Sequence, residues 1–363
     1  MNERRRTELC CDRQELRAML DGMEDWYALL DGFGRPVFAN AALCRSLGCD
    51  GDCQGCSLDC PVQAAAAQSD AVIVEVAGRL YRQAFSHRVD GLTLANWQDV
   101  TREQRVGEAL KRQYERMRRD ILRAQSIQSS LLPQELARAE GYRFDSLYRP
   151  CEEMSGDIFD IFRIGRDNIA FYVADVAGHG VTAAMLTVFF STTVRVEMHP
   201  TDMPGDVLTR IQRRFTQLRL EEQHYITAFL ARLELSTGRL YWCNAGHICP
   251  PVLWDETGVT ALEMPGMPIC RWFEQREYGT SEGMLAPGAR LVLYSDGLVS
   301  LWQCSDKPDM LATVGAILAQ GGDDCLGRIW RAAGEGIGDG ESRDDTTLLL
   351  VERLADQKRK EES

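Results

Sequence analysis

The stretch FYVADVAGHGVTAAM, residues 171–185, joins two apolar runs through a short polar turn. The residues before Ala174 are typical of a buried strand, and those after Gly180 predict a long apolar helix. The turn carries one carboxylate, Asp175, together with two glycines and one of the five histidines of the chain. Such a turn is either a polar connection or a metal or phosphate site, and the rest of the chain has to decide between these.

Acidic residues recur where other apolar runs stop. They are Asp157 and Asp160 in EEMSGDIFD, Asp175, Asp296 in LVLYSDG, and Asp344 and Asp345 in SRDDTTLLLVE. Clustered carboxylates raise one another's pKa unless a cation neutralises them, and oxygen donors without Cys or His suit Mg²⁺ or Mn²⁺. Two such ions can activate a water molecule for attack on a phosphoryl group. The alternative, that Asp and Gly merely form turns, explains one such place more readily than all four.

The second half of the chain alternates between strand and helix patterns. The segments NIAFYVADV, YITAFLARLEL, RLYWCNAG, ARLVLYSDG and TTLLLVERL predict strands, with a hairpin turn at Thr237-Gly238. Residues 181–198, 309–319 and 325–333 predict helices. Many antiparallel strands with helices packed outside them indicate a layered α+β sandwich.

Six motifs in a fixed order strengthen this interpretation: AQSIQSSLLP, MSGDIFD, ADVAGHGVTAAM, NAGHICPPVL, LYSDGLVS and RDDTTLLLVE. Together they resemble the SpoIIE/RsbU branch of the PP2C-like (PPM) serine/threonine phosphatases, over about residues 124–353. The resemblance implies an α/β/β/α sandwich whose inter-sheet cleft holds two Mn²⁺ or Mg²⁺ ions. It also implies hydrolysis of phosphoserine or phosphothreonine, often on an anti-sigma-factor antagonist with a STAS domain.

Residue roles follow from this resemblance motif by motif. Asp175 should bridge the two ions, and the backbone carbonyl of Val176 should complete the ligands of one of them. Asp296 and Asp344 should hold the second ion, and Asp157 should bind the first, mainly through water. These four carboxylates are therefore the predicted catalytic and metal-binding residues. A phosphatase-like docking module without catalysis is the alternative, and the complete carboxylate set favours the enzyme.

Two departures from the family pattern concern single residues. Ser155 stands where the family usually has a glycine, so we expect it to be tolerated with some crowding of the turn. His179 lies four residues after Asp175, whereas eukaryotic relatives place a proposed acid directly beside the bridging Asp, so that role does not transfer. His247, in NAGH, is predicted to be structural, and the role of Asp345 stays open.

Residues 1–103 predict a small α+β unit with a mostly antiparallel sheet. FANAALCRSLG and LANWQDVTREQRVGEAL resemble the beginning and the end of a PAS sensor domain. Within it, four cysteines follow the spacing C-x3-C-x2-C-x3-C: Cys49, Cys53, Cys56 and Cys60. Four thiolates in twelve residues predict a Zn²⁺ site or an iron–sulfur cluster. A redox disulfide switch and inert cysteines are the alternatives, and the sensor itself is a third candidate for the main function of the chain.

Residues 104–135 predict a helical linker with a coiled-coil seam that ends before Pro133. The seam consists of Val106, Leu110, Tyr114, Met117, Ile121, Ala124 and Leu131, with Gln128 as a polar member. It predicts a homodimer and a route by which the sensor could act on the enzyme near residues 125–132. The phosphatase domain is then expected at residues 136–356, with a charged tail at 357–363.

Bulk properties limit the partners of this 363-residue chain. Its net charge of −13 argues against nucleic acid or an anionic membrane as a partner. There is no run of 18 apolar residues, and the first residues lack an apolar signal core. The sequence therefore predicts a cytoplasmic protein.

Overall fold

The computed structural model describes residues 13–33, 35–47, 73–76, 78–89, 91–133, 136, 139–151, 153–178, 180–221, 223–272, 277–303, 309–334 and 344–355. Contacts divide the chain into two compact units, Met1–Met117 and Arg118–Ser363. Each unit is considered separately below. None of the helices in these ranges is long and apolar enough to cross a membrane.

The first unit is an antiparallel sheet with short helices. Its elements are α1 (Arg13–Asp21), β1 (Trp26–Leu30), β2 (Pro36–Ala39), α2 (Ala41–Leu47), β3 (Ile73–Val76), β4 (Arg79–Val89) and β5 (Leu92–Asp99), in the sheet order β2-β1-β5-β4-β3. The antiparallel sheet is as predicted, and Gly78, with a φ of 77°, lies in the turn between β3 and β4. Trp26 stacks on Tyr81 within a core that also contains Leu43 and Trp97.

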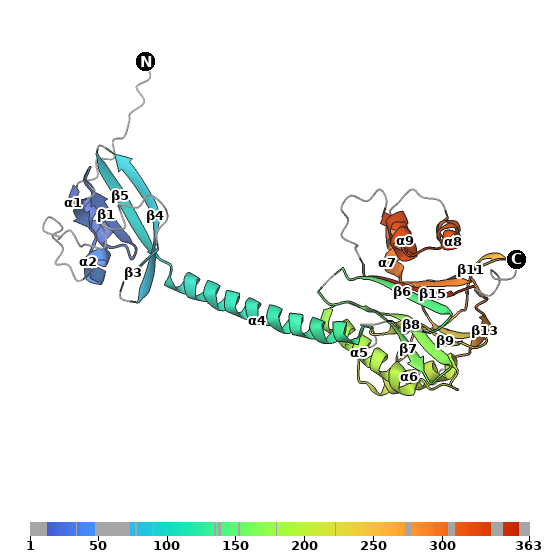
Figure 1. The fold of residues 1–363 in the computed structure, drawn as a ribbon. Helices are drawn as coiled ribbons and strands as arrows, with labels where there is room; N and C mark the ends of the chain where they lie inside the picture. Colours follow the sequence, from blue (N-terminus) through green and yellow to red (C-terminus); the bar gives the residue numbers. More distant parts are fainter. Residues whose placement is uncertain are drawn as a thin grey trace, which may run out of the picture. The chain divides into compact units, whose positions relative to one another are not determined.

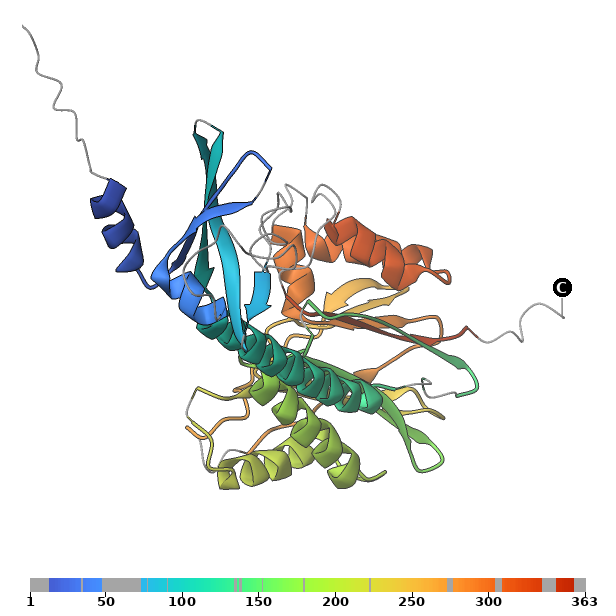
Figure 2. The ribbon, with the colours of Figure 1, turned by 90° about the vertical axis from the view of Figure 1, so that its left-hand side faces the viewer.

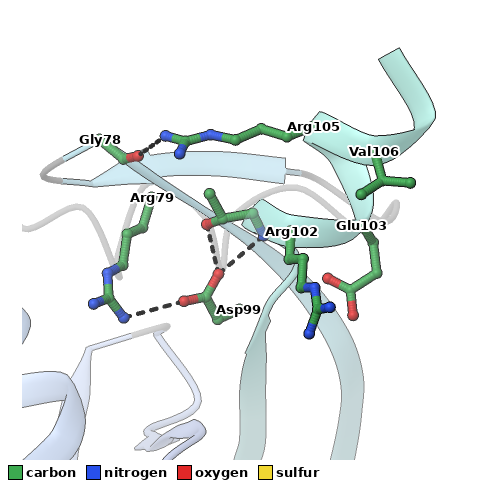
Figure 3. Close-up of a pocket in the computed structure, with 8 residues that line it drawn as sticks. Gly78, Arg79, Asp99, Arg102, Glu103, Arg105 and Val106 are labelled. Atoms are coloured by element: carbon green, nitrogen blue, oxygen red, sulfur yellow. Dashed lines mark hydrogen bonds and ion pairs between the residues drawn. The ribbon is translucent and has the colours of Figure 1, made fainter. Parts of the chain in front are cut away.

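Hydrogen bonds tie the end of this sheet to helix α4 (Thr101–Leu131) (Figure 3). Asp99 Oδ1 accepts from the backbone N–H of Thr101 at 2.9 Å and from its hydroxyl at 2.5 Å, and the Leu80 N–H donates to the same hydroxyl oxygen. Arg79 pairs with Asp99, and Arg105 donates to the Gly78 carbonyl. The first turn of α4 is therefore held by strands β4 and β5.

Helix α4 begins at Thr101, three residues before the predicted start, and Asp99 accepts a hydrogen bond from the backbone N–H of this first residue. Four apolar residues of the predicted seam are exposed by 57–66%, namely Val106, Leu110, Tyr114 and Met117. Near the other end of the helix Gln128 is buried, and Leu131 packs against the core of the second unit. The seam thus changes from exposed to buried along one continuous helix.

The second unit is a four-layer sandwich, as predicted. One sheet has the order β13-β10-β9-β8-β7, and the other has the order β12-β11-β14-β15-β6. The strands are β6 (Tyr142–Arg149), β7 (Asp157–Ile164), β8 (Asn168–Val176), β9 (Ile226–Glu234), β10 (Arg239–Ala245), β11 (Val252–Asp255), β12 (Gly258–Ala261), β13 (Ser281–Met284), β14 (Arg290–Tyr294) and β15 (Thr346–Arg353).

Helices cover the outer face of each sheet (Figures 1 and 2). Helices α5 (Gly180–Glu197) and α6 (Pro204–Gln217) pack on the sheet that contains β7 to β10. Helices α7 (Asp296–Gln303), α8 (Met310–Gln320) and α9 (Cys325–Gly334) pack on the sheet that contains β11, β14 and β15. Helices α5, α8 and α9 match the predicted ranges, whereas α6 and α7 were not predicted.

Strand β8 shows why these apolar runs form buried strands. Ala170, Tyr172 and Ala174 pack toward the helices. Their neighbours Ile169, Phe171 and Val173 pack toward the second sheet. A strand buried on both faces needs apolar residues at every position, because successive side chains point to opposite sides. The apolar run therefore ends only at Asp175, next to the last residue of β8.

Candidate metal centre

Two of the predicted carboxylates lie opposite each other on neighbouring strands. Asp157 begins β7 and pairs in register with Asp175 near the end of β8. Gly156 allows the ends of β7 and β8 to lie close together. A Cβ atom at this position would lie 3.1 Å from the Val176 carbonyl oxygen and 3.3 Å from Asp175 Oδ1. A larger residue would push against both, so glycine lets the two strand ends meet.

Asp157 points into the interior between the sheets and is 2% exposed. Its Oδ2 accepts a hydrogen bond of 2.7 Å from the Thr347 hydroxyl on β15. Burial, followed by the charge of Asp175, raises the pKa of Asp157 well above its usual value. A buried carboxylate in this setting is costly when ionised and unneutralised.

Asp175 is subject to the same effects from more neighbours. Burial raises its pKa to about 7, and the charges of Asp296, Asp344 and Asp345 act in the same direction. The backbone around it is well held, because Ala177 N–H donates to the Tyr225 carbonyl at 3.0 Å. The pKa of Asp175 is therefore raised by the charges of three neighbouring carboxylates, whereas two act on Asp157.

Asp296 and Asp344 lie next to strands of the second sheet, Asp296 after β14 and Asp344 before β15. Asp296 is the first residue of helix α7 and not the end of a strand, because β14 stops at Tyr294. Burial and then the charge of Asp296 raise the pKa of Asp344, which precedes β15. Gly297 allows the two segments to touch, since a Cβ atom there would lie 2.0 Å from the Asp345 carbonyl oxygen.

Asp345, whose role was left open, and Ser155, which departs from the family pattern, are hydrogen-bonded to each other. Asp345 Oδ2 accepts from the Ser155 hydroxyl at 2.7 Å and from the Gly156 N–H at 2.8 Å. Ser155 is tolerated as expected, since its side chain is 2% exposed and satisfied by hydrogen bonds. His247 is structural as predicted: it is buried, and its Nε2 lies 2.9 Å from the Tyr294 carbonyl oxygen.

Some predicted site residues cannot be placed. Cys49, Cys53, Cys56, Cys60 and His179 lie outside the described residues. Conversely, Thr347 and Ser155 contact the site although sequence reasoning assigned neither of them a role there. Gln128 was recognised as a polar member of an apolar seam, and this was the available signal for its burial beside Ser155.

The donor set fits hard divalent cations. It consists of carboxylates and one carbonyl, with no sulfur or imidazole, and such oxygen donors suit Mg²⁺ or Mn²⁺. Within the ranges that the structure describes, no three acidic, His or Cys side chains already converge as a metal-chelating group. The raised pKa values nevertheless identify a place where positive charge would relieve repulsion.

Fold and site together define a PP2C-like protein of the sandwich class. Residues 165–354, more than half of the chain, match the family of stage II sporulation protein E (SpoIIE), and the chain belongs to this family. The match includes Asp175, Asp296 and Asp344 but begins after Asp157.

Individual relatives agree with this assignment. The phosphoserine phosphatase RsbP of Bacillus subtilis is 28% identical over 186 residues, which cover 50% of this chain and 45% of the relative. This chain therefore spans less than half the length of that protein. The SiaA-PP2C domain of Pseudomonas aeruginosa has a TM-score of 0.53 at 19% identity, covering 66% and 98% of the two chains. The RsbU and RsbW domains of a Mycobacterium tuberculosis protein have a TM-score of 0.51 at 23% identity, covering 59% and 60%. Both solved structures share the fold.

Proposed function

We propose that this chain is a metal-dependent protein serine/threonine phosphatase controlled by its N-terminal unit. The observation that carries the proposal is the meeting of Asp157 and Asp175 across β7 and β8, with Asp296 and Asp344 close enough to raise pKa values in the same cluster. Family membership and the phosphoserine phosphatase RsbP among the relatives support it. The substrate that we propose is a phosphoserine or phosphothreonine on a STAS-domain anti-sigma-factor antagonist.

Each residue has a distinct part in this proposal. Asp175 would hold both Mn²⁺ or Mg²⁺ ions, and the Val176 carbonyl and Asp157 would hold the first of them, Asp157 mainly through water. Asp296 and Asp344 would hold the second. When bound, the ions supply an activated water and neutralise charge on the phosphoryl group. Thr347 keeps Asp157 oriented through its 2.7 Å hydrogen bond.

Hydrolysis assays test the proposal directly. We expect p-nitrophenyl phosphate and a phosphoserine peptide to be hydrolysed with Mn²⁺ or Mg²⁺ and not with EDTA. No turnover with any metal, in folded full-length protein and in a chain that starts at residue 124, would favour the docking-module alternative. Turnover by the shorter chain alone would instead indicate an enzyme that its N-terminal unit holds inactive.

The proposed control runs through helix α4, which is fixed at both ends. At its start, Asp99 and Thr101 join it to the first sheet. Near its end, the Gln128 side-chain amide donates to the Ser155 carbonyl at 2.6 Å and to the Thr187 hydroxyl at 2.9 Å, and accepts from the Ser155 N–H at 3.2 Å. A rotation or shift of the helix would therefore reach the residue two positions before Asp157.

Replacing Gln128 by leucine is expected to lower Mn²⁺-dependent turnover about tenfold. The change leaves the buried Ser155 N–H and C=O without these partners, and an unsatisfied buried polar group costs about 1–3 kcal/mol. Steady-state kinetics of the full chain measure the effect. Gln113→Leu, on an exposed position of the same helix, is the matched control. Two results together would contradict the route. One is an unchanged turnover rate in Gln128→Leu, and the other is an unchanged response of turnover to oxidant in a chain that starts at residue 124.

Two further features belong to the proposed regulatory part. We propose a PAS-like sensor whose four cysteines, Cys49, Cys53, Cys56 and Cys60, bind Zn²⁺ or an iron–sulfur cluster, and metal analysis of anaerobically purified protein distinguishes these.

We also propose a homodimer through α4, since an exposed apolar stripe at heptad spacing suits a second copy of the same helix. Sedimentation of the wild type against Leu110→Glu tests the dimer.

A further inference from the structure

Asp345 is a buried carboxylate, and both of its oxygens accept hydrogen bonds from the segment 151–156. It is 7% exposed. Its Oδ1 accepts from the Cys151 N–H at 2.8 Å, and its Oδ2 accepts from the Ser155 hydroxyl and the Gly156 N–H. These three donors lie in the loop that leads from β6 into β7. The carboxylate therefore links the start of β15 to the turn that presents Asp157.

Ser155 connects the Asp345 carboxylate to the backbone of Asp157 through its hydroxyl group. Its hydroxyl oxygen accepts from the Asp157 N–H at 3.1 Å while its proton goes to Asp345. The hydroxyl is thus both donor and acceptor at a buried position. The backbone of the same residue is held from the other side by Gln128.

Asp344 and Asp345 are adjacent but differ in their surroundings. Asp344 is exposed, and the charge of Asp296 acts on it. The Asp345 N–H donates to Asp344 Oδ1 at 2.9 Å, which fixes the two side chains relative to each other. Asp345, in contrast, accepts hydrogen bonds from three donors, all in the loop before β7.

We propose that Asp345 is not a metal ligand but a positioning residue, which acts with Ser155 to hold the turn that aims Asp157 at the metal centre. The inference deepens the proposed function and rests on it for the identity of the centre. Hydrogen-bonded groups behind a ligand set its orientation, and their removal typically lowers metal affinity about 10- to 100-fold. A glycine at position 155 would remove the hydroxyl that connects Asp345 to the Asp157 N–H.

Mn²⁺ binding to the full-length protein tests this without any assay of turnover. Isothermal titration compares wild type, Ser155→Ala, Asp345→Asn and Asp344→Asn, with thermal unfolding in EDTA as the check on folding. Ser191→Ala, another buried serine hydroxyl but on α5, is the matched control. Asp345→Asn turns an amide NH₂ toward backbone N–H donors, so it disturbs the turn at nearly constant volume.

The expected result separates affinity from stoichiometry. Ser155→Ala and Asp345→Asn should each weaken Mn²⁺ binding about 10- to 100-fold while the protein still binds two ions at saturation. Asp344→Asn should lose one ion, and Ser191→Ala should bind as the wild type does. Loss of one ion in Asp345→Asn with wild-type binding in Ser155→Ala would make Asp345 a ligand and overturn the inference.

The remaining outcomes are also decisive. Wild-type affinity in both Ser155→Ala and Asp345→Asn overturns the positioning role but leaves the proposed phosphatase intact. A wild type that binds Mn²⁺ but hydrolyses no phosphoester contradicts the proposed function and leaves the positioning role standing. A wild type that takes up no Mn²⁺ removes the proposed centre itself, and the inference with it.

Discussion

Replacing Asp175 by asparagine is expected to reduce Mn²⁺-dependent hydrolysis of p-nitrophenyl phosphate by about 1,000-fold or more. Asp175 pairs with Asp157 across the strands, and the charges of Asp296 and Asp344 raise its pKa. Metal ions in such a site contribute several kcal/mol of transition-state stabilisation, and each 1.36 kcal/mol corresponds to about a factor of ten in rate. Asparagine keeps the shape but lacks the charge needed to bridge two cations.

The same substitution should have the opposite effect on the stability of the metal-free protein. The pKa of Asp175 is about 7 in the folded chain, above the usual value of 3.8. The folded state therefore binds a proton more readily, so stability is lost as the pH rises from about 4 through 7. In EDTA at pH 8, Asp175→Asn should melt at a higher temperature than the wild type, and the difference should shrink toward pH 5.

Activity and stability measured together make this prediction specific. Asp323→Asn, which neutralises an exposed carboxylate in a surface ion pair with Arg143, is the control and should change neither quantity appreciably. A variant that loses activity and also melts at a lower temperature in EDTA would indicate damage to the fold. A variant that retains wild-type turnover would remove Asp175 from the proposed metal centre.

The parts of this fold that were predictable from the sequence are those encoded locally. The apolar run that ends at Asp175 becomes β8, and the Thr237-Gly238 pair becomes the turn between β9 and β10. Helix α6 was not predicted, although its buried residues, among them Val207, Ile211 and Phe215, lie on one face. Asp296 was taken for a strand end, because a carboxylate after an apolar strand can equally cap or begin a helix.

The contacts that organise the candidate site are not local. Asp345 and Ser155 are 190 positions apart, and so are Thr347 and Asp157. Gln128 meets Thr187 across 59 positions. Such pairs depend on how β7, β15 and α4 pack against one another, with β7 and β15 in different sheets, and the local pattern of one segment does not specify that packing. Motifs could therefore indicate the metal-binding carboxylates, whereas the residues that hold them in place required the structure.

Replacing Arg195 by methionine is expected to destabilise the fold by about 1–3 kcal/mol, because it leaves the buried Asp160 carboxylate without its partner, although water reaches the half-exposed Arg195 side of the pair. Asp160 is fully buried on the face of β7 that meets helix α5. Arg195 Nε and Nη2 donate to its two carboxylate oxygens at 2.7 and 3.0 Å, and the guanidinium also lies 5.0 Å from the centre of the Phe162 ring. Methionine fills much of the same space without the charge.

The pH dependence distinguishes a stranded charge from a simple loss of packing. Burial raises the pKa of Asp160 even in the wild type, and Arg195 opposes that rise, so the variant should have a still higher pKa in the folded state. A raised folded pKa makes stability fall as the pH increases, and the deficit of Arg195→Met in urea unfolding should therefore be larger at pH 8 than at pH 5. The double variant Asp160→Asn/Arg195→Met removes the stranded charge and should recover much of the loss at pH 8. A deficit that is the same at both pH values and persists in the double variant would mean that Arg195 stabilises α5 through its contact with Phe162 alone.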